Sequence, residues 1–89
     1  MIIGKVIGRI VSTRKHERLI GNKFLVCEIK KNNTKETIIA VDTVGAGIGE
    51  HVLIATGSSA RISMPNSEAP VDASIVGIVD EENDLDIFN

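Results

Sequence analysis

The chain has 89 residues, a formal net charge of −2 at pH 7 and a hydrophobic fraction of 43%. A chain of this length forms one domain and buries only about 63% of the surface that it exposes when unfolded. The slight negative charge gives no general attraction to nucleic acid or to an anionic membrane. Cys27 is the single cysteine, so no intrachain disulfide can form. Association between copies is therefore the expected source of further burial.

Neither a membrane span nor a secretory signal is expected. The apolar runs are far shorter than the roughly 20 residues of a spanning helix. The first residues, MIIGKVIGR, lack the basic start and long apolar core of a signal peptide. We therefore expect a cytoplasmic protein with no membrane partner. The apolar residues are mainly Ile, Val, Leu and Ala, with only Phe24 and Phe88 as aromatics, and branched aliphatic side chains favour β-structure.

The first predicted strand is Ile2–Thr13. One face is small and apolar and carries Gly4 and Gly8, as expected where a long strand coils tightly and side chains would crowd. The other face alternates aliphatic residues with Lys5 and Arg9. That mixture fits a surface covered by a neighbour better than one that faces water.

Four further strands are predicted at Lys23–Lys30, Thr37–Asp42, His51–Thr56 and Val71–Asp80. The polar segment Lys30–Glu36 reads as an exposed hairpin connection, and Gly57–Ser63 can hold one helical turn with Ser58 or Ser59 as its N-cap. Five short strands with glycines in the longest ones predict an all-β fold, a small five-stranded OB-like barrel with one short helix. Residues 1–80 form this domain, and residues 81–89 form an acidic tail.

The segment VGAGIGE, residues 44–50, raises the question of nucleotide binding. A dinucleotide fingerprint requires G-x-G-x-x-G opening a helix, but Gly45, Gly47 and Gly49 are followed by Glu50 and by the strand-like HVLIAT. No Gly-Lys-Ser/Thr follows either, so the Walker pattern also fails. We expect no nucleotide cofactor and interpret the segment as a tight connection that needs positive φ or close backbone approach.

The segment GSSAR, residues 57–61, does not complete a serine nucleophile elbow, because Arg61 stands where that motif needs glycine. A helix cap is the favoured role for Ser58 or Ser59. Arg61 is either a solvated side chain or the partner of Glu50 or Asp72 in a bidentate ion pair, within or between subunits. The residues alone leave both readings open.

No catalytic or metal site is expected. Cys27 lies mid-strand on the aliphatic side and is predicted to be buried and inert. His16 and His51 lack the partners of a metal site, and the acidic tail lacks the glycine and terminal Glu of a calcium loop. An OB-type module for single-stranded nucleic acid is the alternative function. Such modules combine a basic groove with aromatic stacking platforms, which this acidic chain lacks.

Four segments in order carry a family resemblance: GKVIGRIVSTRK, LIGNKFLV, IAVDTVGAGIGEHVLIATGSSAR and PVDASIVGIVD. Together they closely resemble the pentameric vertex proteins of bacterial microcompartments, the family of the carboxysome and ethanolamine-utilisation vertex proteins. The resemblance covers about residues 3 to 80. The hairpin at Lys30–Glu36 and the acidic tail are individual to this chain and touch none of the shared motifs.

The resemblance implies a structural protein without catalysis: an OB-like barrel that forms a cyclic homopentamer in the shell of a cytoplasmic microcompartment. The pentamer would cap fivefold corners among hexameric shell proteins, with no nucleic-acid partner. Small residues of the glycine segment would let backbones approach closely, and polar residues would fix the orientation of the subunits. The candidate interface residues are Gly45, Ala46, Gly47, Gly49, Glu50, Ser58, Ser59, Arg61 and Asp72, with Lys5 and Arg9 as weaker candidates.

Overall fold

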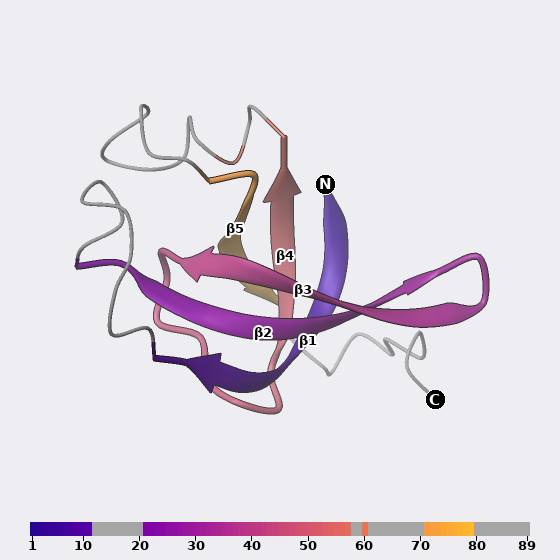
Figure 1. The fold of residues 1–89 in the computed structure, drawn as a ribbon, viewed down its shortest axis with the longest axis horizontal. Coiled ribbons are helices and arrows are strands. Elements are labelled where there is room, and N and C mark those ends of the chain that lie inside the picture. Colours follow the sequence, from indigo (N-terminus) through magenta and orange to yellow (C-terminus); the bar gives the residue numbers. More distant parts are fainter. Residues whose placement is uncertain (12–20, 58–59, 61–70, 80–89) are drawn as a thin grey trace.

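The computed structural model describes residues 1–11, 21–57, 60 and 71–79. It contains five strands: β1 (Ile2–Ile10), β2 (Lys23–Lys31), β3 (Thr34–Asp42), β4 (His51–Thr56) and β5 (Ala73–Val79). They close into a barrel in the order β1-β2-β3-β5-β4 (Figure 1). The predicted five-stranded barrel is thus confirmed. The predicted helical turn falls mostly on residues outside the described part of the chain, as does the acidic tail.

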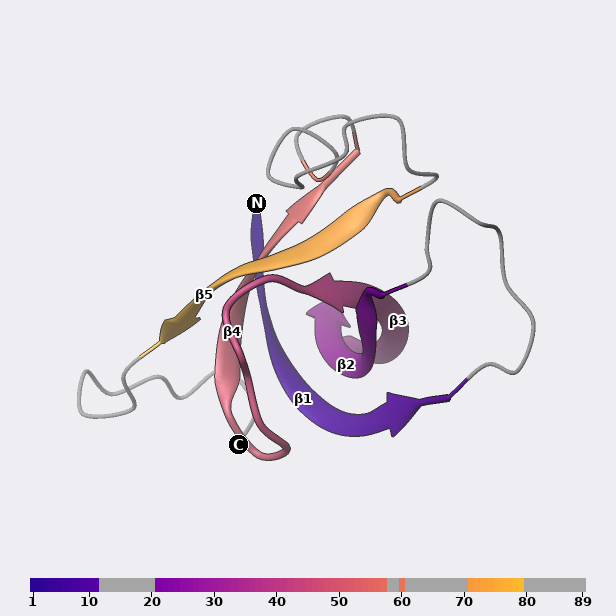
Figure 2. The ribbon, with the colours of Figure 1, turned by 90° about the vertical axis from the view of Figure 1, so that its left-hand side faces the viewer.

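Strand β1 bends so that it serves two neighbours (Figure 2). It pairs with β4 over Ile2–Lys5 and with β2 over Gly4–Ile10. A Cβ at Gly4 would lie 2.7 Å from Ile54 Cδ1 and 3.2 Å from the Glu28 carbonyl oxygen. Such distances leave no room for a side chain, so the expected crowding is confirmed at Gly4.

The same expectation is wrong at Gly8. A Cβ there would meet its nearest neighbour, Val26 Cβ, at 3.9 Å, an ordinary van der Waals contact. The pairing of β1 with β2 shifts register between Val6 and Gly8, which leaves Ile7 as the extra residue of a bulge. A bulge bends a strand and increases its twist, so the turn of β1 at this point comes from the inserted residue.

Alternation along the strands builds the core. In β2, Leu25 and Cys27 are fully buried and Ile29 is nearly so, as predicted from their shared face. They pack with small and branched residues of the other four strands and the loop after β3: Val6, Ala40, Ala46, Val52, Ile54, Ala73 and Ile75. Fully burying one such aliphatic side chain contributes about 1.5–3 kcal/mol, so this cluster is the main source of stability of the isolated barrel.

The β2–β3 hairpin is longer than predicted. Strand β3 begins at Thr34 rather than Thr37, so most of the predicted connection is strand, and the hairpin projects from the barrel as an arm (Figure 1). The turn is Asn32–Asn33, with φ of 52° and 62°. Positive φ at both central residues characterises the type I′ turn, whose twist matches that of the flanking strands. These strand residues were predicted as a connection because they are polar. Both faces of the arm are exposed, so its strands show no alternation of apolar and polar residues.

The remaining strand ends differ by a few residues. Strand β4 has its predicted bounds. Strand β1 ends at Ile10, whereas the predicted strand continues to Thr13. The prediction is wrong at Val11, which lies outside the strand and is 92% exposed. Strand β5 begins at Ala73 rather than Val71, because its pairing with β4 starts at Thr56. Among the described residues, no helix has the length and apolarity needed to cross a membrane.

Candidate subunit interface

The loop of residues 43–50, which joins β3 to β4, is organised around one buried carboxylate. Asp42 Oδ1 accepts the backbone N–H groups of Val44 and Gly45, and Oδ2 accepts that of Ala46, each at 3.0 Å. The Asp42 side chain is only 2% exposed, and Lys23 Nζ lies 3.8 Å from Oδ2. The sequence prediction missed Asp42. An Asp at a strand end that is followed by a glycine-rich segment is the available signal, because Asp side chains accept hydrogen bonds from the backbone just ahead of them.

The second half of the loop is fastened to itself and to β1. The Gly47 N–H donates to Glu50 Oε1 at 2.6 Å, and the Glu50 N–H donates to the Gly47 carbonyl at 3.1 Å. The Gly49 N–H donates to the Val6 carbonyl at 2.8 Å, and the Val6 N–H donates to the Glu50 carbonyl at 3.0 Å. The loop therefore has a fixed shape within a single chain.

Two of the three loop glycines are required by backbone conformation. Gly45 has a φ of 80° and Gly49 a φ of 94°, and a Cβ added at either residue would have no atom within 4 Å. Gly47 has no positive φ, and a Cβ there would lie 3.3 Å from Glu50 Oε1. The expected need for positive φ is confirmed at Gly45 and Gly49. Close packing between subunits at these glycines stays a prediction.

Apolar side chains are exposed around this loop. Ile48 is 61% exposed, Val44 41% and Ile7 42%. Ile48 and Ile7 directly adjoin Gly49 and Val6, whose backbones are hydrogen-bonded. Clustered exposed aliphatic residues of this kind mark contact surfaces. Ala46, by contrast, is buried in the core of its own chain, so its methyl group anchors the loop.

The candidate residues lie at two ends of the barrel. Lys5 pairs with His51 at the start of β4, next to the loop, and Arg9 is exposed further along β1. Asp72 is exposed at the other end, where its carbonyl accepts the Gly57 N–H at 2.8 Å. The length of β4 between these ends is about 17 Å. The two groups therefore do not form one patch on a single chain.

Three candidates, Ser58, Ser59 and Arg61, lie outside the described residues. Ala60 between them is buried at the Asp72 end of the barrel, and its carbonyl accepts Ser74 Oγ at 3.2 Å. A head-to-tail ring joins two different surfaces of each subunit. Glu50 and Lys5 at one end and Asp72 at the other stay predicted residues of two such surfaces.

Reactive and metal-binding groups are scarce in the barrel. Across residues 1–11, 21–57, 60 and 71–79, His, Cys, Asp and Glu form no group of three or more that could hold a metal ion. Cys27 is fully buried. Burial, with a smaller effect of the Asp42 charge, raises the pKa of its thiol to about 11. A thiol is nucleophilic only as the thiolate, so Cys27 is chemically inert near neutral pH.

The chain is similar to shell vertex proteins of bacterial microcompartments along about nine-tenths of its length. The family model described as "Ethanolamine utilisation protein EutN/carboxysome" matches residues 1–80. The microcompartment shell vertex protein GrpN of Rhodospirillum rubrum is 48% identical, with 90% of this chain and 93% of GrpN covered. The carboxysome shell vertex protein CcmL of Synechocystis is 42% identical, with 93% and 86% covered.

Solved structures give the same result. The pentameric shell protein GrpN superposes with a TM-score of 0.79 at 48% identity, covering 90% of this chain and 94% of that one. The pentameric shell protein MSM0273 from the RMM microcompartment superposes with a TM-score of 0.78 at 38% identity, covering 92% and 93%. With a family model over residues 1–80 and relatives above 40% identity over nine-tenths of its length, this chain belongs to the EutN/CcmL family.

Proposed function

We propose that this chain is a structural shell protein whose pentamers cap the vertices of a bacterial microcompartment in the cytoplasm. The observation that carries the proposal is the match to GrpN, a pentameric shell protein 48% identical over 90% of the chain. The named relatives are shell vertex proteins rather than enzymes. Their role favours a structural function over an OB-type nucleic-acid module.

The mechanism is geometric. Five identical heterologous contacts, each rotated by the same angle, close into a ring without a free surface. The loop of residues 43–50, with Glu50 and the exposed Ile48, and the neighbouring Lys5 of β1 supply one side of each contact. The opposite barrel end supplies the other side through Asp72, and we propose that Arg61, the residue after Ala60, takes part in the same contact. The hydrogen bonds that fix the loop in the single chain support this assignment, because a preorganised surface loses less entropy on association.

The pentamer would act among hexameric shell proteins of another fold. Hexagonal tiles alone pack into flat sheets, and a fivefold unit at each corner introduces the curvature that closes a shell. Rigidity of the pentamer is then the functional property. No group of this chain needs to react for the shell to close.

Shell closure tests the proposed function. Shells are assembled from the hexameric proteins of the same host with this chain, without it, and with a variant that folds but stays monomeric. We expect closed polyhedra in electron micrographs only with the intact chain, and open or tubular sheets otherwise. Equally closed shells in its absence would contradict a vertex role.

A further inference from the structure

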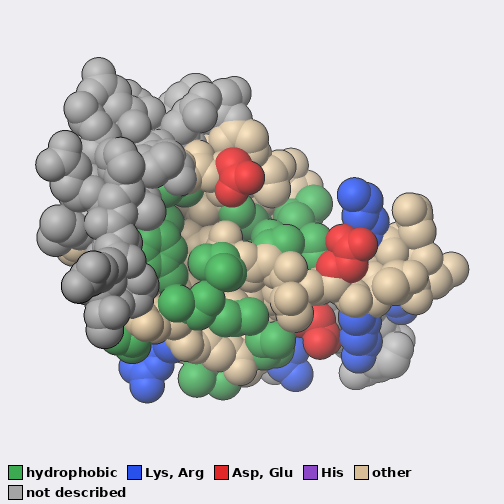
Figure 3. All heavy atoms as spheres, in the orientation of Figure 1, with side chains coloured by type: hydrophobic (Ala, Val, Ile, Leu, Met, Phe, Trp, Pro, Cys, Tyr) green, Lys and Arg blue, Asp and Glu red, His purple; other side chains and the backbone are tan. Residues whose placement is uncertain are grey.

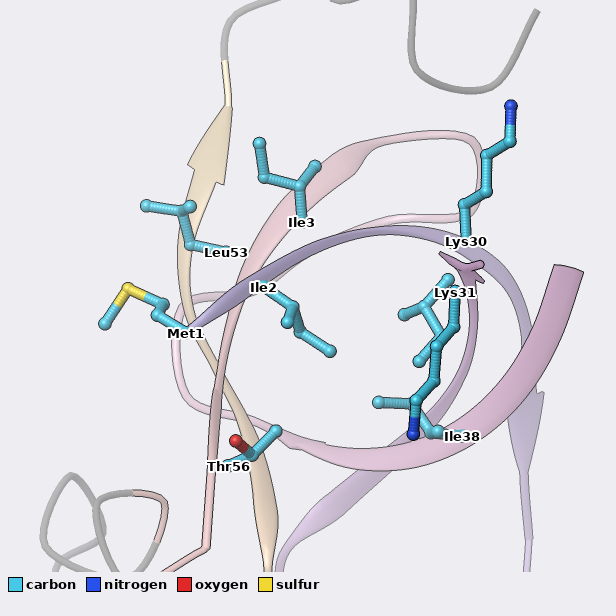
Figure 4. Close-up of a pocket in the computed structure, with 9 residues that line it drawn as sticks. Met1, Ile2, Ile3, Lys30, Lys31, Ile38, Leu53 and Thr56 are labelled. Carbon is cyan, nitrogen blue, oxygen red and sulfur yellow. The ribbon is translucent and has the colours of Figure 1, made fainter. Parts of the chain in front are cut away.

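An apolar cavity lies at the end of the barrel remote from the glycine loop, the end that also carries Asp72, and none of the proposed ring-contact residues lines it. It has a volume of about 810 Å³ and opens to solvent. Its apolar lining is Met1, Ile2, Ile3, Ile29, Ile38 and Leu53. Figure 4 shows Ile2 directed into the ring of strands toward Ile38, with Ile3 and Leu53 on the outer side of the same opening.

Two lysines complete the lining. Lys31 lies beside Ile38, and Lys30 extends away from the ring of strands (Figure 4). Lys30 is also opposite Lys35 across the hairpin, and like charges at directly opposite positions are unfavourable. Lys35 Nζ lies 3.7 Å from Glu28 Oε1, so Lys35 has an ion-pair partner. Lys30 and Lys31 have no ion-pair partner among the described residues, so two lysines that no described carboxylate pairs stand at the edge of the apolar cavity.

The complementary sequence occurs in the same chain. Residues 80–89 read DEENDLDIFN, with five carboxylates, no basic side chain and three large apolar residues, Leu85, Ile87 and Phe88. We propose that this C-terminal segment docks in the cavity of its own chain. Leu85, Ile87 and the adjoining Phe88 contact the apolar wall, and Asp84 and Asp86 neutralise Lys30 and Lys31. This proposal is independent of the vertex function.

The segment is long enough for this path. Strand β5 ends at Val79, and Gly77, two residues earlier, pairs with Leu53 of the cavity wall. Ten residues extend to about 33 Å at most. Val79 pairs with His51 beside the glycine loop, two residues or about 7 Å along β4 from Leu53 of the cavity wall. From β5, the lysines of β2 lie across β4 and β1 in the barrel order, a further three strand spacings or about 14 Å. The segment therefore reaches both lysines with residues to spare.

Charge along the arm supports this occupant over a neutral one. Figure 3 shows Lys and Arg side chains on and below the arm, Asp and Glu side chains at its base, and apolar side chains over the barrel body. An acidic segment with apolar side chains fits the border between these two surfaces. If an acidic, apolar segment of another protein were the true occupant of the cavity, residues 80–89 would stay in solvent, and a fluorophore placed in them would emit like a free peptide.

Tryptophan fluorescence tests the docking, because the chain has no Trp and no Tyr. In the assembled protein, Phe88→Trp introduces a single fluorophore. We expect its emission to be blue-shifted and protected from iodide relative to a free peptide of residues 80–89 with the same change. Emission identical to that of the free peptide overturns the proposal.

Charge reversal locates the site. Two charge reversals are made in the Phe88→Trp background: Lys30→Glu/Lys31→Glu on the arm and Asp84→Lys/Asp86→Lys in the C-terminal segment. Each is expected to shift the emission to the red. The variant that carries all four reversals is expected to recover the blue shift. The control is Lys35→Gln, on the same arm but outside the cavity lining; it puts no carboxylate opposite Lys30, and unchanged emission is expected. The tail-side variant leaves the barrel sequence intact, so it remains informative if the arm variant fails to fold. Emission insensitive to both reversals, or no recovery on combining them, overturns the proposal.

Mixed assemblies separate docking in the same chain from docking in a neighbour. Chains carrying Phe88→Trp and Lys30→Glu/Lys31→Glu are co-assembled with an excess of unmodified chains, and native mass confirms the mixing. Docking within one chain predicts emission that stays red-shifted. Recovery of the blue shift would place the segment on a neighbouring subunit and contradict the proposal.

Discussion

At the scale of single residues, two buried groups govern the loop and the core in different ways. Asp42 fastens three backbone N–H groups of the glycine loop, and Cys27 fills the core as a neutral thiol. Neither role follows from residue type alone. Asp42 needed the folded path of residues 43–46 before its carboxylate could be placed, whereas burial of Cys27 followed from strand alternation.

Asp42→Asn tests the fastening of the loop. The amide keeps the size of the side chain but replaces one acceptor oxygen by an NH₂ donor. At least one of the backbone N–H groups of residues 44–46 therefore loses its hydrogen-bond acceptor. We expect a loss of about 1–3 kcal/mol in the free energy of unfolding, measured in urea at fixed chain concentration. Glu36→Gln, which neutralises an exposed carboxylate of β3, is the control, and we expect it to lie within about 0.5 kcal/mol of the parent. Equal midpoints for both variants would refute the role of Asp42.

Stability above pH 9 tests the environment of Cys27. The pKa of the thiol rises from 9.0 to about 11 on folding, so between these values the unfolded chain loses a proton that the folded chain keeps. Stability must then fall as pH rises through this interval, by roughly 2–3 kcal/mol. The measurement is the difference in unfolding free energy between the parent and Cys27→Ala at each pH, which removes the contribution of the lysines. A difference that stays constant from pH 8 to 11 would contradict the assignment.

At the scale of elements, the sequence predicted strands best where one face is buried. Strand β4 matched at both ends, because Val52 and Ile54 of HVLIAT enter the core. Strand β3 was predicted three residues short, because its start lies on the arm, where both faces are exposed. The candidate site was predicted as a set of motif residues, but their division between two barrel ends depends on strand order, which local patterns do not encode.

Asn33 tests the turn of the arm. Its φ of 62° is disfavoured for a β-branched residue, and Asn33→Val is expected to lower the free energy of unfolding by about 1–2 kcal/mol. Asn33→Gly is expected to leave it unchanged or raise it, since Asn-Gly is the preferred type I′ pair. Thr34→Val, one residue further in regular strand, is the matched control with little change expected. Thermal unfolding at one chain concentration measures all three, and equal melting temperatures for the two valine variants would exclude a type I′ turn.

At the scale of the whole molecule, the contacts between subunits are expected to depend on a charge pair between Glu50 of one subunit and Arg61 of the next. Glu50→Gln removes the charge while keeping Oε1, the atom that accepts the Gly47 N–H, so the loop keeps its shape. We expect Glu50→Gln and Arg61→Ala each to weaken the ring by about 2 kcal/mol or more per contact while leaving the fold of the chain intact. Dissociation on dilution measures the effect. Strictly additive losses in the double variant would show that the two residues do not interact.

The most direct test of the central claim is the native mass of the purified chain across a dilution and salt series. A cyclic, heterologous ring predicts one dominant species with five times the mass of a single chain, without intermediates of two or four chains at concentrations where the ring is stable. Monomers throughout the series, or a closed assembly of any other number of chains, would contradict the account.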